Sequence, residues 1–352
     1  MLKNIGFWLT FGLISVPTIT QALETSPINI GQIHTIPSKT LNENRDIQIY
    51  LPSSYNEYPN QRYPVLYLLD GESNFHYLTG FVQKLSKTPY PHIPEMIVVG
   101  IINTDRARDL TPTPQNQSSD NKNRNIQGET GGNANFFLFL ETELMPYIEQ
   151  NYRTTGFNSL IGHSFGGITA LNHLLNGSQE IQAYVVHDPS IWWDDEVILK
   201  RFQSTTKDDF LHKKLFISQV DRNENQGELS AHYNGIQKLD AYLKERSFNH
   251  LNYQYVQYSN EDHGTIPLKG NLDGLRYIFD GININIKAIP HNPNLVKEHY
   301  ETLSKHLNFT FQPSEPYLAS VLNYLKRSAD KSVQTEFLNY ILTIYPDSKL
   351  SL

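Results

Sequence analysis

Short apolar segments alternate with longer amphipathic segments along most of this chain. Residues 45–51 alternate apolar and polar side chains, which is typical of a half-buried strand. Residues 63–69 and 96–102 are continuous apolar runs rich in Val, Ile and Leu, the composition of parallel strands that are covered on both faces. Residues 136–152 carry apolar side chains at helical spacing. We therefore expect three strands followed by a helix.

The second half of the chain repeats this order. A short apolar run ends at Gly162, and two further apolar runs follow at residues 183–187 and 214–220. An amphipathic segment then covers residues 228–246, and a last strand is predicted at residues 251–258. Alternating strands and helices predict an α/β fold with a mainly parallel central sheet and flanking helices. Ligand chemistry in such sheets gathers at the carboxyl ends of the strands.

Two regions depart from this alternation. Residues 103–135 are polar and without an apolar period, and a connection of that length is either a lid that contacts substrate or an irregular insertion. Residues 295–307, 317–327 and 333–345 read as three helices, which predict a small helical appendage over residues 290–352. Its last part resembles a fragment of a tetratricopeptide-type repeat, and one such unit is too few to stand alone.

The amino-terminal residues predict export. A lysine, an apolar run over residues 5–16 and the sequence Thr20-Gln21-Ala22 are typical of a signal peptide over residues 1–22. The alternative is a retained anchor helix, but the apolar run is short for a membrane span. We expect a periplasmic or secreted protein that is not inserted in the membrane after cleavage, with a catalytic domain over residues 23–285.

Composition narrows the function further. The chain has no cysteine, so neither a disulfide framework nor a lipid-attachment site is expected. Its net charge of −7 is spread over interspersed acids and bases, which argues against a nucleic-acid partner. We find neither an H-E-x-x-H motif nor clustered Cys/His spacing, and expect no metal ion or cofactor.

The clearest chemical motif surrounds Ser164. Gly162 and Gly166 flank it in a G-x-S-x-G pattern. An apolar strand precedes this pattern, and a predicted helix follows it, with Ile168 and Leu171 as its first apolar positions. Glycines at these positions allow a sharp turn that presents the hydroxyl at the end of the strand. We expect Ser164 to be a nucleophile.

A serine nucleophile needs an imidazole base and a carboxylate that orients it, in the chain order Ser, Asp or Glu, His. His263 follows the last predicted strand and is the best-placed base, with His187 as its competitor. Asp221 and Glu224 both follow the strand at residues 214–220, and either could be the acid.

Further candidates surround this site. The developing oxyanion requires two backbone N–H donors, which we assign to Phe165 and to either Gly71 or Glu72 in the loop after residues 63–69. Side chains that could contact the substrate, or could instead serve packing and surface charge, are Trp192, Trp193, Arg106 and Arg108.

Four motifs together resemble one family of α/β-hydrolases. They are Tyr67 to Gly71 (YLLDG), Gly162 to Gly167 (GHSFGG), Asp188 to Trp193 (DPSIWW) and Asp262 to Thr265 (DHGT). The match over about residues 30–280 is similar to the esterase family that includes enterochelin (ferric siderophore) esterases. The resemblance implies an α/β-hydrolase fold and a small-molecule ester substrate.

The resemblance also implies a triad of Ser164, Glu224 and His263. Siderophore esterases carry a G-x-x-E turn where this chain has Asp221 in place of the glycine, so Asp221 stays open as an alternative acid. The same family contains formylglutathione hydrolases, feruloyl and acetyl-xylan esterases and mycolyltransferases. A siderophore esterase, a general carboxylesterase, an acyltransferase and a non-catalytic binding protein on the same fold are therefore all compatible with the sequence.

Overall fold

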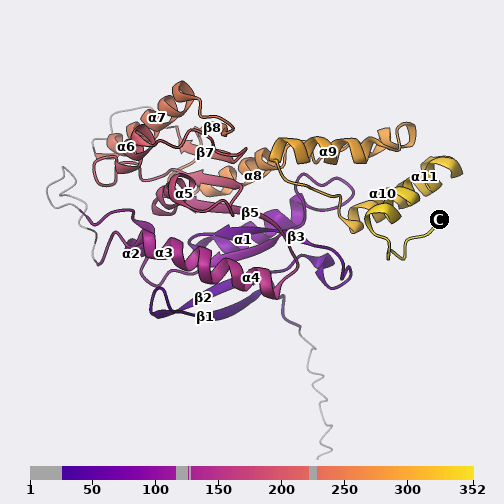
Figure 1. The fold of residues 1–352 in the computed structure, drawn as a ribbon, viewed down its shortest axis with the longest axis horizontal. Coiled ribbons are helices and arrows are strands. Elements are labelled where there is room, and N and C mark those ends of the chain that lie inside the picture. Colours follow the sequence, from indigo (N-terminus) through magenta and orange to yellow (C-terminus); the bar gives the residue numbers. More distant parts are fainter. Residues whose placement is uncertain (1–25, 116–125, 127, 222–227) are drawn as a thin grey trace, which may run out of the picture.

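The structure is a computed structural model that describes residues 26–115, 126, 128–221 and 228–352. In this part of the chain, eight strands form one sheet in the order β1-β2-β4-β3-β5-β6-β7-β8 (Figure 1). The strands are β1 (Gln32–Ser38), β2 (Glu43–Tyr50), β3 (Tyr63–Leu68), β4 (Ile97–Ile101), β5 (Thr154–His163), β6 (Ala183–His187), β7 (Lys214–Val220) and β8 (Asn252–Tyr258). All pairs from β4 to β8 are parallel, while β2 is antiparallel to both β1 and β4. The predicted α/β-hydrolase architecture is confirmed.

Helices cover both faces of the sheet, which explains the continuous apolar runs. Along β3, Val65 and Tyr67 enter one hydrophobic core, while Leu66 and Leu68 enter the other. The first core is closed by α3 (Asn133–Phe139), α4 (Met145–Asn151), α5 (Phe165–Asn176), α6 (Val197–Ser204) and α7 (Glu228–Arg246). The second core is closed by α1 (Gly71–Leu85), α8 (Ile266–Ile278) and the carboxyl-terminal helices. Successive side chains of a strand point to opposite faces, so both faces must be apolar.

The predicted helix at residues 136–152 is present with one irregularity. Between α3 and α4 the chain makes a π-helical turn, Leu140–Leu144. Pro146 follows at the start of α4 and has no N–H to donate to the preceding turn, which favours a local change of hydrogen-bond pattern. The helix nevertheless packs as expected, with Leu140, Leu144 and Ile148 buried.

The polar stretch at residues 103–135 is more ordered than the sequence indicates. It contains a short helix, α2 (Arg106–Leu110), and the start of α3. The Asp105 carboxylate accepts a hydrogen bond from the backbone N–H of Arg108 and so caps α2. Residues 116–125 and 127 lie outside the described residues, so the lid prediction stays a prediction.

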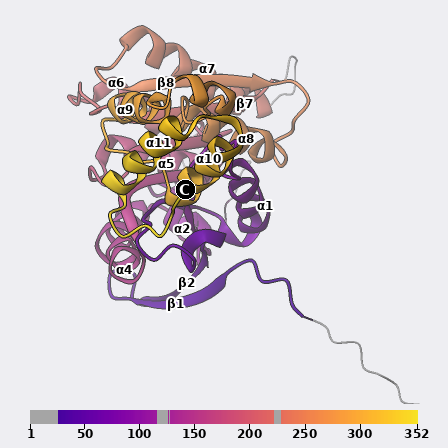
Figure 2. The same cartoon turned by 90° about the vertical axis from the view of Figure 1, so that its right-hand side faces the viewer.

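Three carboxyl-terminal helices lie against the sheet domain (Figure 2). They are α9 (Leu295–Leu307), α10 (Glu315–Ser328) and α11 (Lys331–Ile344), close to the predicted bounds. Phe157 of β5 contacts Phe309 and Phe311, with ring centroids 5.3 and 5.0 Å apart. The Tyr345 hydroxyl donates a hydrogen bond of 2.9 Å to Oε1 of Gln61. The helices therefore share a core with the sheet.

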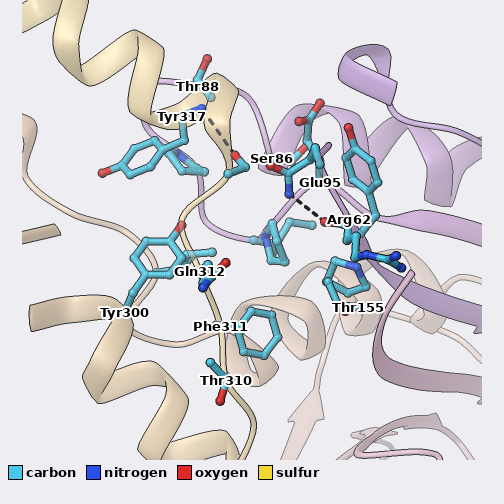
Figure 3. A pocket seen from close by; sticks show the side chains of 18 of the residues that line it. Arg62, Ser86, Thr88, Glu95, Thr155, Tyr300, Thr310, Phe311, Gln312 and Tyr317 are labelled. Atoms are coloured by element: carbon cyan, nitrogen blue, oxygen red, sulfur yellow. Dashed lines mark hydrogen bonds between the residues drawn. The ribbon is translucent and has the colours of Figure 1, made fainter. Parts of the chain in front are cut away.

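A cavity of about 340 Å³ lies at the junction of these helices and the sheet (Figure 3). Tyr300, Phe311 and Tyr317 line it on the helical side, and Arg62 and Thr155 line it on the sheet side. Thr155 stands near the start of β5, and nine residues of extended strand, roughly 30 Å, separate it from Ser164. The cavity therefore lies near the amino-terminal end of β5, whereas the predicted nucleophile Ser164 follows its carboxyl-terminal end.

No helix among the described residues is both long and apolar enough to cross a bilayer. The predicted signal peptide at residues 1–22 lies outside the described residues, and its cleavage stays a prediction.

Candidate active site

Ser164 occupies a strained turn between β5 and α5. Its backbone angles are φ 56° and ψ −112°, a conformation that L-residues with a side chain rarely adopt. A Cβ atom on Gly162 would lie only 2.1 Å from the carbonyl oxygen of Gly166, so this strand and helix can meet only if residue 162 is glycine. This geometry is the sharp strand-to-helix turn expected from the G-x-S-x-G motif.

The last residue of β6 and the segment that follows it hold Ser164 in place. The backbone N–H of Ser164 donates to the carbonyl oxygen of His187 at 3.0 Å, and the N–H of Ser190 donates to the carbonyl oxygen of Ser164 at 3.1 Å. The hydroxyl oxygens of Ser164 and Ser190 are 3.1 Å apart. Ser190 is buried, and it was not singled out from the sequence although it lies within the Asp188 to Trp193 motif.

His263 lies beside this turn and is oriented by Asp188. Its Nδ1 is 2.8 Å from Oδ2 of Asp188, and its ring centroid is 4.4 Å from that of His163, the neighbour of Ser164. A carboxylate can only accept hydrogen bonds, so Nδ1 carries the proton and Nε2 keeps its lone pair. His263 thus has the tautomer that a general base requires, and its side chain is 44% exposed.

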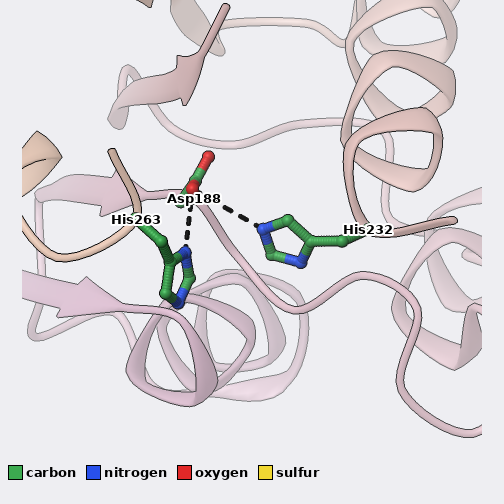
Figure 4. A group of neighbouring side chains, drawn as sticks. All are labelled: Asp188, His232 and His263. Atoms are coloured by element: carbon green, nitrogen blue, oxygen red, sulfur yellow. Dashed lines mark hydrogen bonds and ion pairs between the residues drawn. The ribbon is translucent and has the colours of Figure 1, made fainter. Parts of the chain in front are cut away.

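Asp188 is fully buried at the end of β6. Burial alone would raise the pKa of its carboxyl group, but the neighbouring His232 imidazole and hydrogen bonds from His263 and from the backbone N–H of Val220 hold that pKa well below its usual range. Oδ1 accepts the Val220 N–H at 3.1 Å, and Oδ2 faces the two imidazoles (Figure 4). Asp188 is therefore ionised and is the acid that the structure places on His263.

The two acids expected from the sequence have different outcomes. Asp221 follows β7, where its backbone N–H donates to the carbonyl oxygen of Tyr258 at 2.9 Å. Because Nδ1 of His263 is bonded to Asp188, the structure does not support the alternative in which Asp221 orients the imidazole. Glu224 lies outside the described residues, so its role stays a prediction.

His187, the competing base, faces away from the serine. Its Nδ1 is 2.7 Å from the Ser218 hydroxyl, and its Nε2 is 2.8 Å from Oδ1 of Asn271. Burial lowers the pKa of His187 to about 4, so the ring is neutral at physiological pH. With both nitrogens bonded inside the core, His187 is not available as the base.

The predicted oxyanion donors open two neighbouring helices. Phe165 is the first residue of α5, and Gly71 and Glu72 are the first residues of α1, which follows β3. N–H groups in the first turn of a helix have no acceptor within the helix. A Cβ atom on Gly71 would lie 2.8 Å from the carbonyl carbon of Gly100, which explains the glycine. The two donors stay a prediction that this placement supports.

The predicted substrate-contact residues are mostly engaged with the protein itself. Trp193 is only 2% exposed and packs edge-on against Phe165, so the structure places it in the core and not on a pocket wall. Trp192 is half-buried and also contacts Phe165, with ring centroids 6.1 Å apart. It could therefore still border a substrate.

The two arginines are ion-paired. Arg108 is bonded to Glu43 and Asp109, which ties α2 to β2 and corrects the expectation that it grips the substrate. Arg106 donates two hydrogen bonds to Asp70 and lies over the ring of Phe165, with 36% of its side chain exposed. Arg106 is thus near the turn that carries Ser164, and its contact with substrate stays a prediction.

Comparisons with known proteins identify the family of this chain. The sequence model of the family described as "Putative esterase" matches residues 38–255, more than half of the chain. The ferri-bacillibactin esterase of Bacillus subtilis is 30% identical over 63% of this chain and 81% of its own length, and the apo-salmochelin esterase of Escherichia coli is 26% identical over 58% of this chain and 66% of its own length. A crystal structure described as an IroE-like serine hydrolase from Shewanella oneidensis superposes with a TM-score of 0.80 and 31% identity, covering 89% of this chain and 99% of that chain.

Proposed function

The chain belongs to the esterase family and is a serine hydrolase that acts on carboxylic ester bonds, and we propose that it cleaves siderophore esters through an acyl-enzyme formed on Ser164. The observation that carries the mechanism is the contact of 2.8 Å between Nδ1 of His263 and the buried Asp188 carboxylate, beside the strained turn of Ser164. In this proposal Ser164 is the nucleophile, His263 the base and Asp188 the orienting acid.

The reaction would proceed in two halves. The Ser164 hydroxyl attacks the ester carbonyl carbon while Nε2 of His263 takes its proton. The tetrahedral intermediate collapses, the C–O bond to the alcohol breaks, and the imidazolium gives its proton to the departing oxygen. A water molecule then attacks the acyl-enzyme with the same proton transfers and releases the acid. Asp188 stays ionised and stabilises the imidazolium in both halves.

Backbone dipoles would stabilise the developing oxyanion. The N–H groups of Phe165 and of Gly71 or Glu72 stand at the starts of α5 and α1, so the helix dipoles also favour negative charge there. Loss of one such donor typically costs about 10²–10³-fold in rate. In this proposal both donors belong to the starts of helices and need no rearrangement during the reaction.

The substrate class rests on the relatives. Four curated relatives, from bacteria and fungi, carry names that specify siderophore esters, and the Bacillus subtilis esterase is matched over most of its length. A siderophore with ester-linked units offers several equivalent bonds to one serine. A general carboxylesterase and an acyltransferase would use the same residues, so the substrate must be identified by assay.

Hydrolysis of a ferric catecholate trilactone tests the substrate. We expect a kcat/KM of about 10⁴ M⁻¹s⁻¹ or more, within the usual range for enzymes on their own substrates. p-Nitrophenyl esters from acetate to octanoate should be cleaved with a lower kcat/KM despite their better leaving group. Enzyme treated beforehand with a fluorophosphonate is the control and should be inactive. Rapid cleavage of short p-nitrophenyl esters with an intact trilactone would instead identify a general carboxylesterase.

Export to the periplasm or the medium is a separate part of the proposal. The support is the charged, apolar and small-residue pattern of residues 1–22. Amino-terminal sequencing of the protein from its native host should begin at Leu23, in the periplasmic or extracellular fraction. A membrane-bound protein that still begins at Met1 would contradict cleavage and support the anchor-helix alternative.

A further inference from the structure

Three side chains from distant segments converge at the edge of the site (Figure 4). Asp188 follows β6, His232 comes from α7, and His263 follows β8. Each offers one ligand atom, and these three atoms all lie within 4.8 Å of one another. Two imidazoles and a carboxylate form a ligand set that suits zinc.

His232 is not explained by the hydrolytic mechanism. It is 5% exposed, and its Nε2 has no hydrogen-bond partner although the atom is buried. A buried polar nitrogen without a partner costs about 1–3 kcal/mol, so such a group calls for an explanation. Nε2 lies 3.6 Å from Oδ2 of Asp188 and points toward it (Figure 4). The His232 ring also meets the His263 ring edge-on, with centroids 5.2 Å apart.

The distances around Asp188 are close to those of a metal site. Zinc bonds of 2.0–2.1 Å in tetrahedral geometry separate neighbouring ligand atoms by roughly 3.4 Å. Oδ2 of Asp188 is 3.6 Å from Nε2 of His232 and 2.8 Å from Nδ1 of His263, and all three ligand atoms lie within 4.8 Å of one another, so a small shift of the His263 ring would accompany zinc binding. His263 is 44% exposed, which leaves an entry path and room for water as a fourth ligand.

We propose that Asp188, His232 and His263 form an inhibitory zinc site that switches the hydrolase off. This inference rests on the proposed function, because the same Asp188–His263 pair serves the reaction. A neutral imidazole carries one proton, so zinc on Nδ1 moves that proton to Nε2. Nε2 then has no lone pair to accept the Ser164 proton, and the carboxylate charge that stabilised the imidazolium is neutralised by the metal. Zinc removal restores the active tautomer.

Binding is measured first, without hydrolysis. Calorimetric titration of zinc chloride into Ser164→Ala protein should show one ion per chain. In the Ser164→Ala background, the further substitution His232→Asn should lower the affinity for zinc by at least about tenfold, as loss of a metal-binding partner does. In the same background His299→Asn, which removes a half-buried histidine on α9, is the matched control and should leave binding unchanged. Equal binding with and without His232 would overturn the proposal.

Inhibition is measured second, with each protein compared with its own zinc-free rate. Zinc should inhibit ester hydrolysis by the natural sequence, and EDTA should reverse it. His232→Asn should need at least about tenfold more zinc for half-inhibition. His232→Phe keeps a ring against His263 and Tyr233 but has no nitrogen, so it separates the loss of a zinc ligand from a loss of packing. It should need as much zinc for half-inhibition as His232→Asn. Unchanged inhibition in both variants would overturn the proposal. A protein that hydrolyses no ester even without zinc would instead contradict the proposed function, and the calorimetric test of zinc binding would still be valid.

Discussion

Ser164→Ala should hydrolyse esters at least about 10³-fold more slowly than the natural sequence, and it should not react with a fluorophosphonate. The substitution removes the only atom to which the acyl group can be transferred in the proposed mechanism. The oxyanion donors and the base remain, which explains why some rate above that in water should persist. The measurement is kcat/KM for p-nitrophenyl butyrate, together with labelling by a fluorescent fluorophosphonate.

Ser190→Ala is the matched control for this prediction. It removes a hydroxyl that lies 3.1 Å from the Ser164 hydroxyl, and the two residues are also joined by a backbone hydrogen bond of 3.1 Å. Because Ser190 contacts Ser164 and is itself buried, we expect a loss of about tenfold or less, the scale of one neutral hydrogen bond. Labelling that survives in Ser164→Ala and disappears in Ser190→Ala would assign the nucleophile to Ser190.

The sheet could be predicted from the sequence because its strands are covered on both faces. Continuous Val, Ile and Leu runs leave few alternatives to a buried strand, and β3, β4, β6 and β7 are buried at every residue. Ser164 could be predicted for a local reason as well. Its turn depends on two glycines within two residues of it, so the motif and the geometry lie in one short segment.

Two helices that the sequence analysis does not predict, α1 and α8, begin without a side-chain cap, although Pro267 stands in the first turn of α8. α1 follows Asp70, which has a left-handed backbone conformation and gives no side-chain cap, and α8 follows Thr265, which also gives none. β1 was missed because it is an edge strand with several exposed residues. These elements are stabilised by packing on the finished sheet, which the local pattern does not contain.

The acid and the metal-binding cluster depend on contacts between distant segments. Asp188 follows β6, one strand earlier than the usual place for the acid. The usual chain order therefore predicts an acid after β7 instead of Asp188. His232 is one of many side chains in a predicted amphipathic helix, and only the packing of α7 brings it to Asp188. The motif from Asp188 to Trp193 was the available signal, but nothing in it distinguishes an acid from a structural turn.

Asp188→Asn should lower kcat by about 10³–10⁴-fold, the loss expected when the imidazole is held in the wrong tautomer. An amide in place of the carboxylate can donate to Nδ1, which would leave the proton on Nε2 and the base inactive. It also removes the charge that stabilises the imidazolium. The variant changes few atoms, so the fold should persist, and circular dichroism with a thermal melt verifies that.

Glu224→Gln is the matched comparison, because both variants exchange one carboxylate for an amide of the same size. If Asp188 orients His263, as the contact of 2.8 Å supports, Glu224→Gln should lose less than about tenfold, the scale expected when a carboxylate does not orient the base. Both are measured as kcat on one ester from pH 5 to 9. A loss of about 10³-fold in Glu224→Gln with an active Asp188→Asn would assign the acid to Glu224, as the family resemblance implies, and would leave Asp188 as a buried partner of His232 and the Val220 backbone.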